Sequence, residues 1–226
     1  MNMGKGCAGP WVGSALMIDQ PPTLSYPTSL PSTGDALLNP AAGEAFCPFS
    51  APLSNFASDL WLSFQEESLV ASSGAFVDLQ PVLSFPDIQV NKAAGGAITL
   101  NGKAAGPSNG PGQVDFFLLQ LSQFSGTTTV NLFVDPGPLL GAPSASFTIS
   151  SPFVLNQFYY RSDPSQLLDE IRVGTTVSDV AATSTAVPEP AAMLLLGIGL
   201  AVAGIRRPYG RVSRGRIRRR IRCWDS

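Results

Sequence analysis

An antiparallel sandwich of β-sheets is the fold class that this sequence of 226 residues predicts. Between residues 60 and 174, short runs of alternating apolar and polar residues are separated by turn-forming segments, with no helical period between them. Charged residues make up only 13% of the chain, which holds 22 glycines and 20 prolines, a composition typical of many short strands joined by turns. The length suffices for one domain with a buried core, together with tails.

The strands are expected in order along the chain, after a loop-rich beginning. Residues 1–58 are rich in Pro, Gly, Ser and Ala, and we expect them to form the N-terminal part of the sandwich with one or two short strands. At residues 60–65, LWLSFQ, the alternation of apolar side chains is typical of a strand with one buried face. Further strands are expected at 74–80, 96–100, 113–121, 128–135, 145–150, 153–160 and 169–174.

Residues 59–174 therefore constitute the predicted core of the sandwich. Segments such as NGKAAGPSNGPG and DPGPLLGAP supply the turns. After Gly174, residues 175–186 are small and polar, and we interpret them as a linker. Two sheets packed face to face would bury the following side chains: Leu62, Phe64, Val77, Leu79, Leu119, Leu132, Val134, Phe147 and Ile171.

Several kinds of catalytic and metal site are excluded by composition. The chain has no histidine, which removes the commonest general base and the commonest zinc ligand. Cys7, Cys47 and Cys223 are far apart and have no metal-ligand spacing, although a disulfide between Cys7 and Cys47 is possible in an oxidising compartment. Three carboxylates could supply oxygen ligands to calcium, but no dense acidic loop surrounds them: Asp115, Asp135 and Asp163. We expect no metal and no cofactor.

The acidic pairs of the body do not match the needs of a glycan-cleaving enzyme. A retaining hydrolase uses two carboxylates about 5 to 5.5 Å apart. Glu66 and Glu67 are adjacent, as are Asp169 and Glu170, and adjacent residues of a strand point to opposite faces. We interpret both pairs as solvated ends of strands and expect a protein that is not an enzyme, with a glycan-active enzyme as the alternative.

The C-terminal end combines an apolar run with an arginine cluster. Residues 191–205, AAMLLLGIGLAVAGI, are apolar throughout, and a helix of this length rises about 22 Å, against about 30 Å for a hydrocarbon core. Up to Ile205 the chain has 5 Lys and Arg against 15 Asp and Glu, whereas Arg206 onward has 9 Arg against one Asp. The positive-inside rule keeps these arginines cytoplasmic, with the acidic body exported. We expect a single C-terminal transmembrane helix.

Two other interpretations of this end are weaker. A buried core helix is disfavoured by the flanking arginines and the terminal position. The segment RVSRGRIRRRIR could bind the phosphates of nucleic acid or anionic lipid, but no fold or aromatic interleaving supports base recognition. We therefore expect a membrane partner and no nucleic acid.

The ordered combination of VPEP at 187–190, the apolar run and the arginines resembles the PEP-CTERM sorting signal of bacterial surface proteins. The resemblance implies recognition by exosortase, a membrane-embedded transpeptidase, in species that make extracellular polysaccharide. It assigns residues 187–207 to the sorting signal and residues 208–226 to an Arg-rich cytoplasmic tail that is longer than the family's usual ending. The residues that it singles out are Pro188, Glu189 and Pro190 as the sorting motif and Arg206 and Arg207 as the membrane stop.

An exported body needs a leader, and the N-terminus offers a weak one. One lysine and an interrupted apolar stretch at 11–18 precede no good small-residue cleavage site. We expect the natural start to lie upstream and to add a signal peptide and a first strand of the sandwich, because an absent strand would leave an open sheet edge.

The body resembles the concanavalin A-like, laminin-G-like jelly-roll domains of bacterial surface proteins, through motifs such as LWLSF (60–64), VNLFVDP (130–136) and DEIRVGTTVSDV (169–180). The resemblance implies a jelly-roll sandwich, a fold that lectins, glycoside hydrolases and structural modules share. Sugar binding would use exposed aromatic side chains as stacking platforms. The candidate carbohydrate contacts are Trp61, Tyr159 and Tyr160.

These observations together predict a non-catalytic, exported protein of the cell surface or extracellular matrix. Before processing it would be a single-pass membrane protein, with the body exported and the C-terminus cytoplasmic. The expected partners are an exosortase-type enzyme, the membrane and extracellular polysaccharide. The alternatives are a glycan-active enzyme on the same fold and a permanently anchored structural protein.

Overall fold

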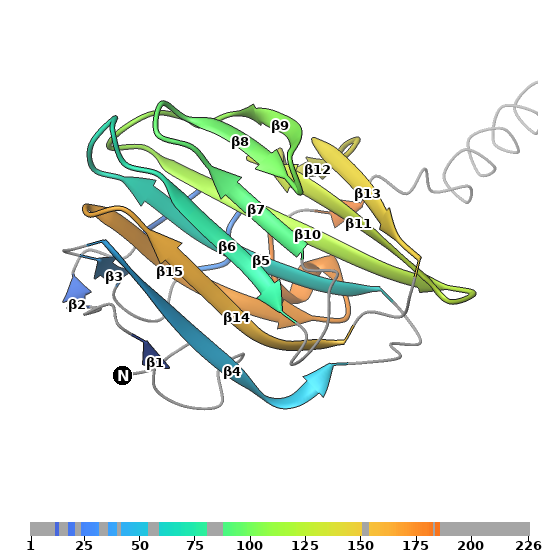
Figure 1. The fold of residues 1–226 in the computed structure, drawn as a ribbon. Coiled ribbons are helices and arrows are strands. Elements are labelled where there is room, and N and C mark those ends of the chain that lie inside the picture. Colours follow the sequence, from blue (N-terminus) through green and yellow to red (C-terminus); the bar gives the residue numbers. More distant parts are fainter. Residues whose placement is uncertain are drawn as a thin grey trace, which may run out of the picture. The chain divides into compact units, whose positions relative to one another are not determined.

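The protein is an all-β sandwich, as predicted (Figure 1). The computed structural model describes residues 12–13, 18–20, 24–31, 36–39, 42–53, 59–80, 88–150, 154–182 and 184–185. The chain divides into two units, residues 1–186 and 187–226, and the second lies outside the described residues. Expectations for the sorting motif, the apolar run and the arginines therefore concern a part of the chain that the structure does not describe.

Two seven-stranded antiparallel sheets make up the sandwich, here called the front sheet and the back sheet. In spatial order, the front sheet contains β1 (Val12–Gly13), β4 (Gly43–Leu53), β14 (Leu155–Ser162), β6 (Ala75–Gln80), β7 (Ile88–Lys92), β8 (Ala97–Leu100) and β9 (Lys103–Pro107). The back sheet contains β13 (Ala145–Ile149), β11 (Thr127–Val134), β10 (Val114–Phe124), β5 (Leu60–Ser68), β15 (Gln166–Gly174), β3 (Ala36–Asn39) and β2 (Ile18–Gln20).

Each of the eight strands predicted by alternation overlaps an observed strand. The core between the sheets contains seven of the nine predicted core residues as buried side chains, and the other two, Val134 and Phe147, pack against them partly buried. The β10–β11 hairpin turns at Ser125 and Gly126, whose φ angles of 50° and 79° are those of the mirror-image turns that suit twisted hairpins. Alternation thus locates these eight strands and the faces that they bury. It did not predict β7 and β9, and the expectation of one or two short strands before residue 59 was wrong, because β1 to β4 lie there and β4 alone has 11 residues.

Two segments cover the outer face of the back sheet. Residues 24–31 and 175–182 cross it and contact each other, through a bridge between Ser29 and Ala181 and a hydrogen bond from the Ala182 N–H to the Thr28 carbonyl. The Ser63 hydroxyl of β5 donates to the Val180 carbonyl over 2.8 Å. A second apolar cluster fills the space beneath the segments: Trp61, Phe116, Leu118, Phe133, Val180 and Ala181.

Residues 175–182, which we had interpreted as part of a linker, are therefore a packed element of the sandwich. They include the 3-10 turn Val177–Asp179, in which Asp179 accepts hydrogen bonds from the Thr175 and Thr176 N–H groups. The linker interpretation was wrong here because the apolar residues that matter, Val180 and Ala181, are few and pack against strands distant in the sequence. Beyond them, β16 (Ser184–Thr185) pairs in parallel with β12 (Leu139–Leu140).

In the part of the chain that the structure describes, no helix is long and apolar enough to cross a bilayer. The predicted transmembrane run at 191–205 lies outside that part.

Candidate functional site

A buried ion pair joins the two sheets inside the sandwich. The Lys92 ammonium of β7 lies 2.6 Å from the Asp115 carboxylate of β10, and their side chains are 2% and 0% exposed. Asp115 also accepts a hydrogen bond of 2.7 Å from the Asn109 N–H. Two charges removed from water in this way must compensate one another, because an unpaired buried charge is costly.

Glu66 lies beside this pair and is itself buried, with only 2% of its surface exposed. It is opposite Asp115 in the β5–β10 register. Burial raises the pKa of Glu66 from 4.5 to about 7; Lys92 opposes the rise and Asp115 adds to it. Residues of β5 with even numbers face the core, so Glu66 points inward while Glu67 points away. The expectation that Glu66 ends a strand in solvent was wrong.

Asp169 is also buried rather than solvated. It is 7% exposed and accepts a hydrogen bond of 2.9 Å from the Leu24 N–H, which holds the segment 24–31 to the back sheet. Its neighbour Glu170 pairs with Arg172 over 2.5 Å. A register shift between Asp169 and Arg172 interrupts the simple alternation there. These carboxylates therefore fasten the fold and do not face one another across a cleft.

The structure brings two of the three candidate calcium ligands together and separates the third. The Asn109 backbone N–H binds Asp115, and its side-chain amide donates to Asp135 over 2.8 Å. Burial raises the pKa of Asp135 to about 6, against a hydrogen bond from the Phe116 N–H that lowers it. Asp163 lies elsewhere, bound to the Gly74 N–H. Among the described residues no group of three or more metal-ligating acids, cysteines or histidines occurs.

The outer face of the front sheet carries a row of aromatic side chains. Tyr159 of β14 and Phe76 of β6 meet edge to face, with ring centroids 6.4 Å apart. The Tyr159 hydroxyl donates a hydrogen bond to the Glu44 carboxylate of β4. Burial, and then the bond to Glu44, raise the pKa of Tyr159 to about 12, so the hydroxyl stays protonated as a donor. Phe46 lies opposite Tyr159 in the β4–β14 register and extends the row.

Polar side chains alternate with these rings across the same face. Arg161 lies opposite Phe76, and Phe76 lies opposite Asn91 of β7. Arg161 and Asn91 are exposed. Asp78 lies opposite Tyr159 on one side and Gln89 on the other. Because alternate residues of a strand share a face, aromatic rings, amides, carboxylates and a guanidinium lie next to one another here. We call this surface the front face.

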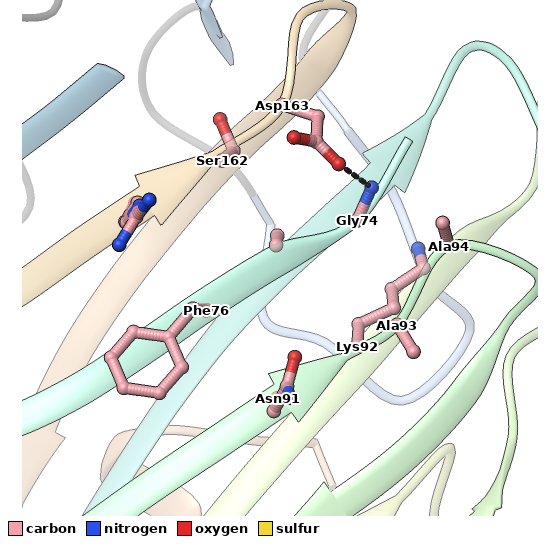
Figure 2. A pocket seen from close by; sticks show the side chains of 10 residues that line it. Gly74, Phe76, Asn91, Lys92, Ala93, Ala94, Ser162 and Asp163 are labelled. Carbon is pink, nitrogen blue, oxygen red and sulfur yellow. Dashed lines mark hydrogen bonds between the residues drawn. The ribbon is translucent and has the colours of Figure 1, made fainter. Parts of the chain in front are cut away.

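A cavity of about 290 Å³ hollows one end of the front face (Figure 2). Phe76 and Asn91 border it, with Arg161 and Asp163 among its polar lining residues. Figure 2 shows the Asp163 carboxylate bound to the Gly74 N–H, a contact of 3.0 Å. A side chain at Gly74 would lie 2.7 Å from the Lys92 carbonyl, so only glycine allows the two strands to meet this closely beside the cavity.

The three predicted carbohydrate contacts fall in different places. Tyr159 lies on the front face and is partly exposed. Tyr160 points into the core at 1% exposed, and Trp61 is 5% exposed beneath the covering segments, where it stacks on Phe133. Neither offers a ring face to a ligand. Alternation within GAFVDLQ and FVLNQFYYRS places Phe76 beside Asp78 and Arg161 beside Tyr159, a signal that could have found more of the front face. The sequence analysis did not single out the following front-face residues: Glu44, Phe46, Phe76, Asn91 and Arg161.

Comparison with protein families matches residues 186–207 to the PEP-CTERM protein-sorting motif. The match covers Pro188 to Pro190 and Arg206 and Arg207 and confirms the resemblance inferred from those residues. This motif is the signal that exosortase recognises, and it marks the chain for export to the cell envelope or surface. No curated protein matches the chain.

Solved structures with a similar fold include the SPRY domain of human HERC1, which is 16% identical with a TM-score of 0.39, over 63% of this chain and 91% of that one. Lectin II from Ulex europaeus is 11% identical with a TM-score of 0.37, over 70% of this chain and 97% of the lectin. The metal-free form of lectin I-B4 from Griffonia simplicifolia is 11% identical with a TM-score of 0.39, over 74% of this chain and 93% of the lectin.

Proposed function

We propose that this chain is a non-catalytic surface or matrix protein that binds carbohydrate through the front face. The observation that carries the proposal is the packing of Tyr159 against Phe76, surrounded by amide, carboxylate and guanidinium groups on an open sheet. Sugar rings stack their apolar C–H faces on aromatic rings, and their hydroxyls need donors and acceptors nearby. Export to the cell surface, which the sorting motif implies, would bring the protein to extracellular polysaccharide.

The back sheet is a poorer candidate for binding. Its outer face is crossed by residues 24–31 and 175–182, which bury Trp61, Phe116 and Phe133. A ligand there would have to displace both segments. The front face needs no such rearrangement, since Arg161 and Asn91 are already exposed on it.

The absence of catalysis is part of the proposal. Glu66 and Asp115 are opposite each other in the register, but both are buried beside Lys92, away from solvent and substrate. Glycoside hydrolysis needs carboxyl groups on both sides of an accessible glycosidic bond. The chain would be processed by an exosortase-type enzyme after a single-pass stage in the membrane through residues 191–205, with its arginines in the cytoplasm.

Binding to polysaccharide can be tested with front-face variants. We expect Tyr159→Ala with Phe76→Ala to lower the affinity for extracellular polysaccharide about tenfold or more, because each aromatic contact contributes about 0.5–1.5 kcal/mol. Affinity electrophoresis in gels containing polysaccharide from exosortase-bearing bacteria measures the effect. Phe124→Ala is the matched control, since Phe124 is 84% exposed at the β10–β11 turn, outside the front face.

Two results would contradict the proposal. One is unchanged retardation of the double variant in these gels, or an equal loss of retardation for Phe124→Ala. The other is release of reducing sugar ends from the polysaccharide by the purified protein, which would support the glycan-active alternative.

A further inference from the structure

We infer that the cavity at the end of the front face accepts an uncharged sugar unit and rejects sugars that carry a carboxylate or sulfate. This inference rests on the proposed carbohydrate function and adds the class of ligand. It follows from the hydrogen-bonding groups of the cavity, their charges and the size of the space.

The lining offers both kinds of hydrogen-bonding partner that a sugar hydroxyl requires. The guanidinium of Arg161 and the amide of Asn91 are donors, and the Asp163 carboxylate is an acceptor. One oxygen of Asp163 is held by the Gly74 N–H at 3.0 Å, which fixes the direction of the carboxylate. A sugar hydroxyl can donate and accept hydrogen bonds at the same time, so it can bind a donor such as Arg161 and an acceptor such as Asp163 together.

The lining holds two cations, Lys92 and Arg161, and one carboxylate, Asp163, but each cation has a further carboxylate beside it outside the lining. Lys92 is among the lining residues, but its ammonium is paired with buried Asp115 at 2.6 Å and contributes little net charge. Arg161 remains as the exposed cation, with Asp163 beside it in the lining. Glu44 lies opposite Arg161 in the register, yet its carboxylate is bound by the Tyr159 hydroxyl.

A second anion brought to Arg161 would therefore meet Asp163 and Glu44 at close range. Like charges brought together at a binding surface are costly and exclude such partners. The whole body adds to this effect, because residues up to Ile205 have a net charge of −10 and repel acidic polymers over longer distances. An uncharged sugar encounters neither penalty.

The dimensions of the cavity fit one sugar unit. Its volume of about 290 Å³ lies at the lower end of the range for small-molecule sites. Phe76 borders the space, so a single ring can stack on it while its hydroxyls reach Arg161, Asn91 and Asp163. The neighbouring rings of a polymer would continue over Tyr159 along the front face.

The test compares neutral polysaccharides with their carboxylated forms. A chain ending at Ala186, which is a compact unit of its own and lacks the arginine tail, is titrated with dextran, xylan and galactan, and with the carboxymethyl derivative of each. We expect binding of at least one neutral polymer and at least tenfold weaker binding of its derivative, at low salt where repulsion is greatest. Arg161→Gln should weaken the neutral interaction about tenfold.

Asp163→Asn separates charge from shape, because the amide oxygen can still accept from the Gly74 N–H. This variant should keep neutral binding within about threefold and improve binding of the carboxymethyl derivative about tenfold, which corresponds to the removal of one close repulsion. Glu67→Gln, on β5 of the back sheet, removes the same charge away from the cavity and should alter neither affinity.

Binding of the acidic derivatives as tightly as the neutral polymers, with loss in Tyr159→Ala and Phe76→Ala, would overturn this inference and leave the proposed function standing. Neutral binding that is insensitive to Arg161→Gln and Asp163→Asn would also overturn it. If none of the polymers binds, this inference fails, and if the front-face variants also leave retardation by the natural polysaccharide unchanged, the proposed function fails as well.

Discussion

Single residues in the interior decide where the sandwich tolerates charge. Lys92 and Asp115 are paired at 2.6 Å, whereas Glu66 beside them has its pKa raised to about 7 by burial. The difference has a simple cause. One ammonium can neutralise one carboxylate, and a second carboxylate in the same low-dielectric space is more stable with its proton.

Replacing Glu66 with glutamine should remove a pH-dependent loss of stability. Below pH 4.5, the ordinary pKa, Glu66 is protonated in the folded and unfolded chains alike. Between pH 4.5 and about 7 the unfolded chain releases the proton and the folded one keeps it, so the free energy of unfolding falls by about 1.4 kcal/mol per pH unit. The contribution of Glu66 to the free energy of unfolding is therefore fully present below pH 4.5 and is lost as the pH rises to about 7, a total loss on the order of 3 kcal/mol.

Urea denaturation at pH 5 and pH 8 measures this effect. Asp135, whose pKa is raised to about 6, contributes a slope of the same sign in both proteins, so the difference between wild type and Glu66→Gln isolates Glu66. Glu67 is the partly exposed neighbour of Glu66, and Glu67→Gln is the control. Its loss of stability between pH 5 and pH 8 should equal that of the wild type. Equal losses of stability in wild type and Glu66→Gln would show that Glu66 is ionised in the folded protein.

At the scale of elements, the two-residue period explains which side chains of β14 are available. Tyr159 and Tyr160 are adjacent, and the strand places the first on the front face and the second in the core. This distinction could be predicted from the sequence, because Phe158 and Tyr160 alternate with Tyr159 and Arg161. The front face itself could be assembled only in part. In β7 the alternation of Ile88 and Val90 with polar residues is short and ends in the charged Lys92, and β9 consists of small residues without an apolar pattern.

The covering segments show what periodicity does not reveal. Trp61 alternates with core residues, and its side of β5 would be solvent-exposed in an uncovered sheet. Val180 and Ala181, more than 100 residues later, bury it. Because their stretch of sequence is mostly small and polar, its local pattern resembles a linker, and only the contacts with Trp61 and Phe133 distinguish the two cases.

A chain ending at Gly174 should be less stable than one ending at Ala186. The shorter chain loses Val180 and Ala181, each 1% exposed, and so uncovers Trp61 and removes the carbonyl that accepts the hydrogen bond of Ser63. We expect the free energy of unfolding to fall by about 3–5 kcal/mol, from the apolar area returned to water and one lost hydrogen bond. Thermal and urea unfolding followed by tryptophan fluorescence measure it.

Both chains lack the apolar run at 191–205, so the comparison is not affected by association through that segment. Val180→Ala in the longer chain is a milder variant and should lose about 1–2 kcal/mol. Equal unfolding midpoints for the two truncated chains would show that residues 175–182 do not stabilise the sandwich and act as a linker.

For the molecule as a whole, charge and cysteine chemistry agree with export. The acidic body and the tail of nine arginines are separated by the uncharged run, an asymmetry that orients a membrane segment. Cys47 is fully buried and disulfide-bonded. Disulfides persist in oxidising compartments, which is where the sorting signal sends the body.

The final prediction concerns processing at the sorting motif. In a bacterium that contains exosortase, the full chain behind a secretory leader should lose its arginine tail and leave the membrane fraction. Glu189→Ala should retain the tail and stay with the membrane, because we expect recognition to require the carboxylate between Pro188 and Pro190. An epitope placed after Ser226 and a second within the body, followed by immunoblotting of membrane and surface fractions, distinguish the two forms.

Glu67→Ala makes the same side-chain change in the body and should be processed normally. Retention of the C-terminal epitope by the wild-type chain in the exosortase host would instead identify a permanently anchored protein. Equal processing of wild type and Glu189→Ala would mean that another part of residues 186–207 directs sorting, since the apolar run and Arg206 and Arg207 are unchanged in that variant. The same blot in a host without exosortase should show the tail on every variant, which ties its removal to the enzyme and not to general proteolysis.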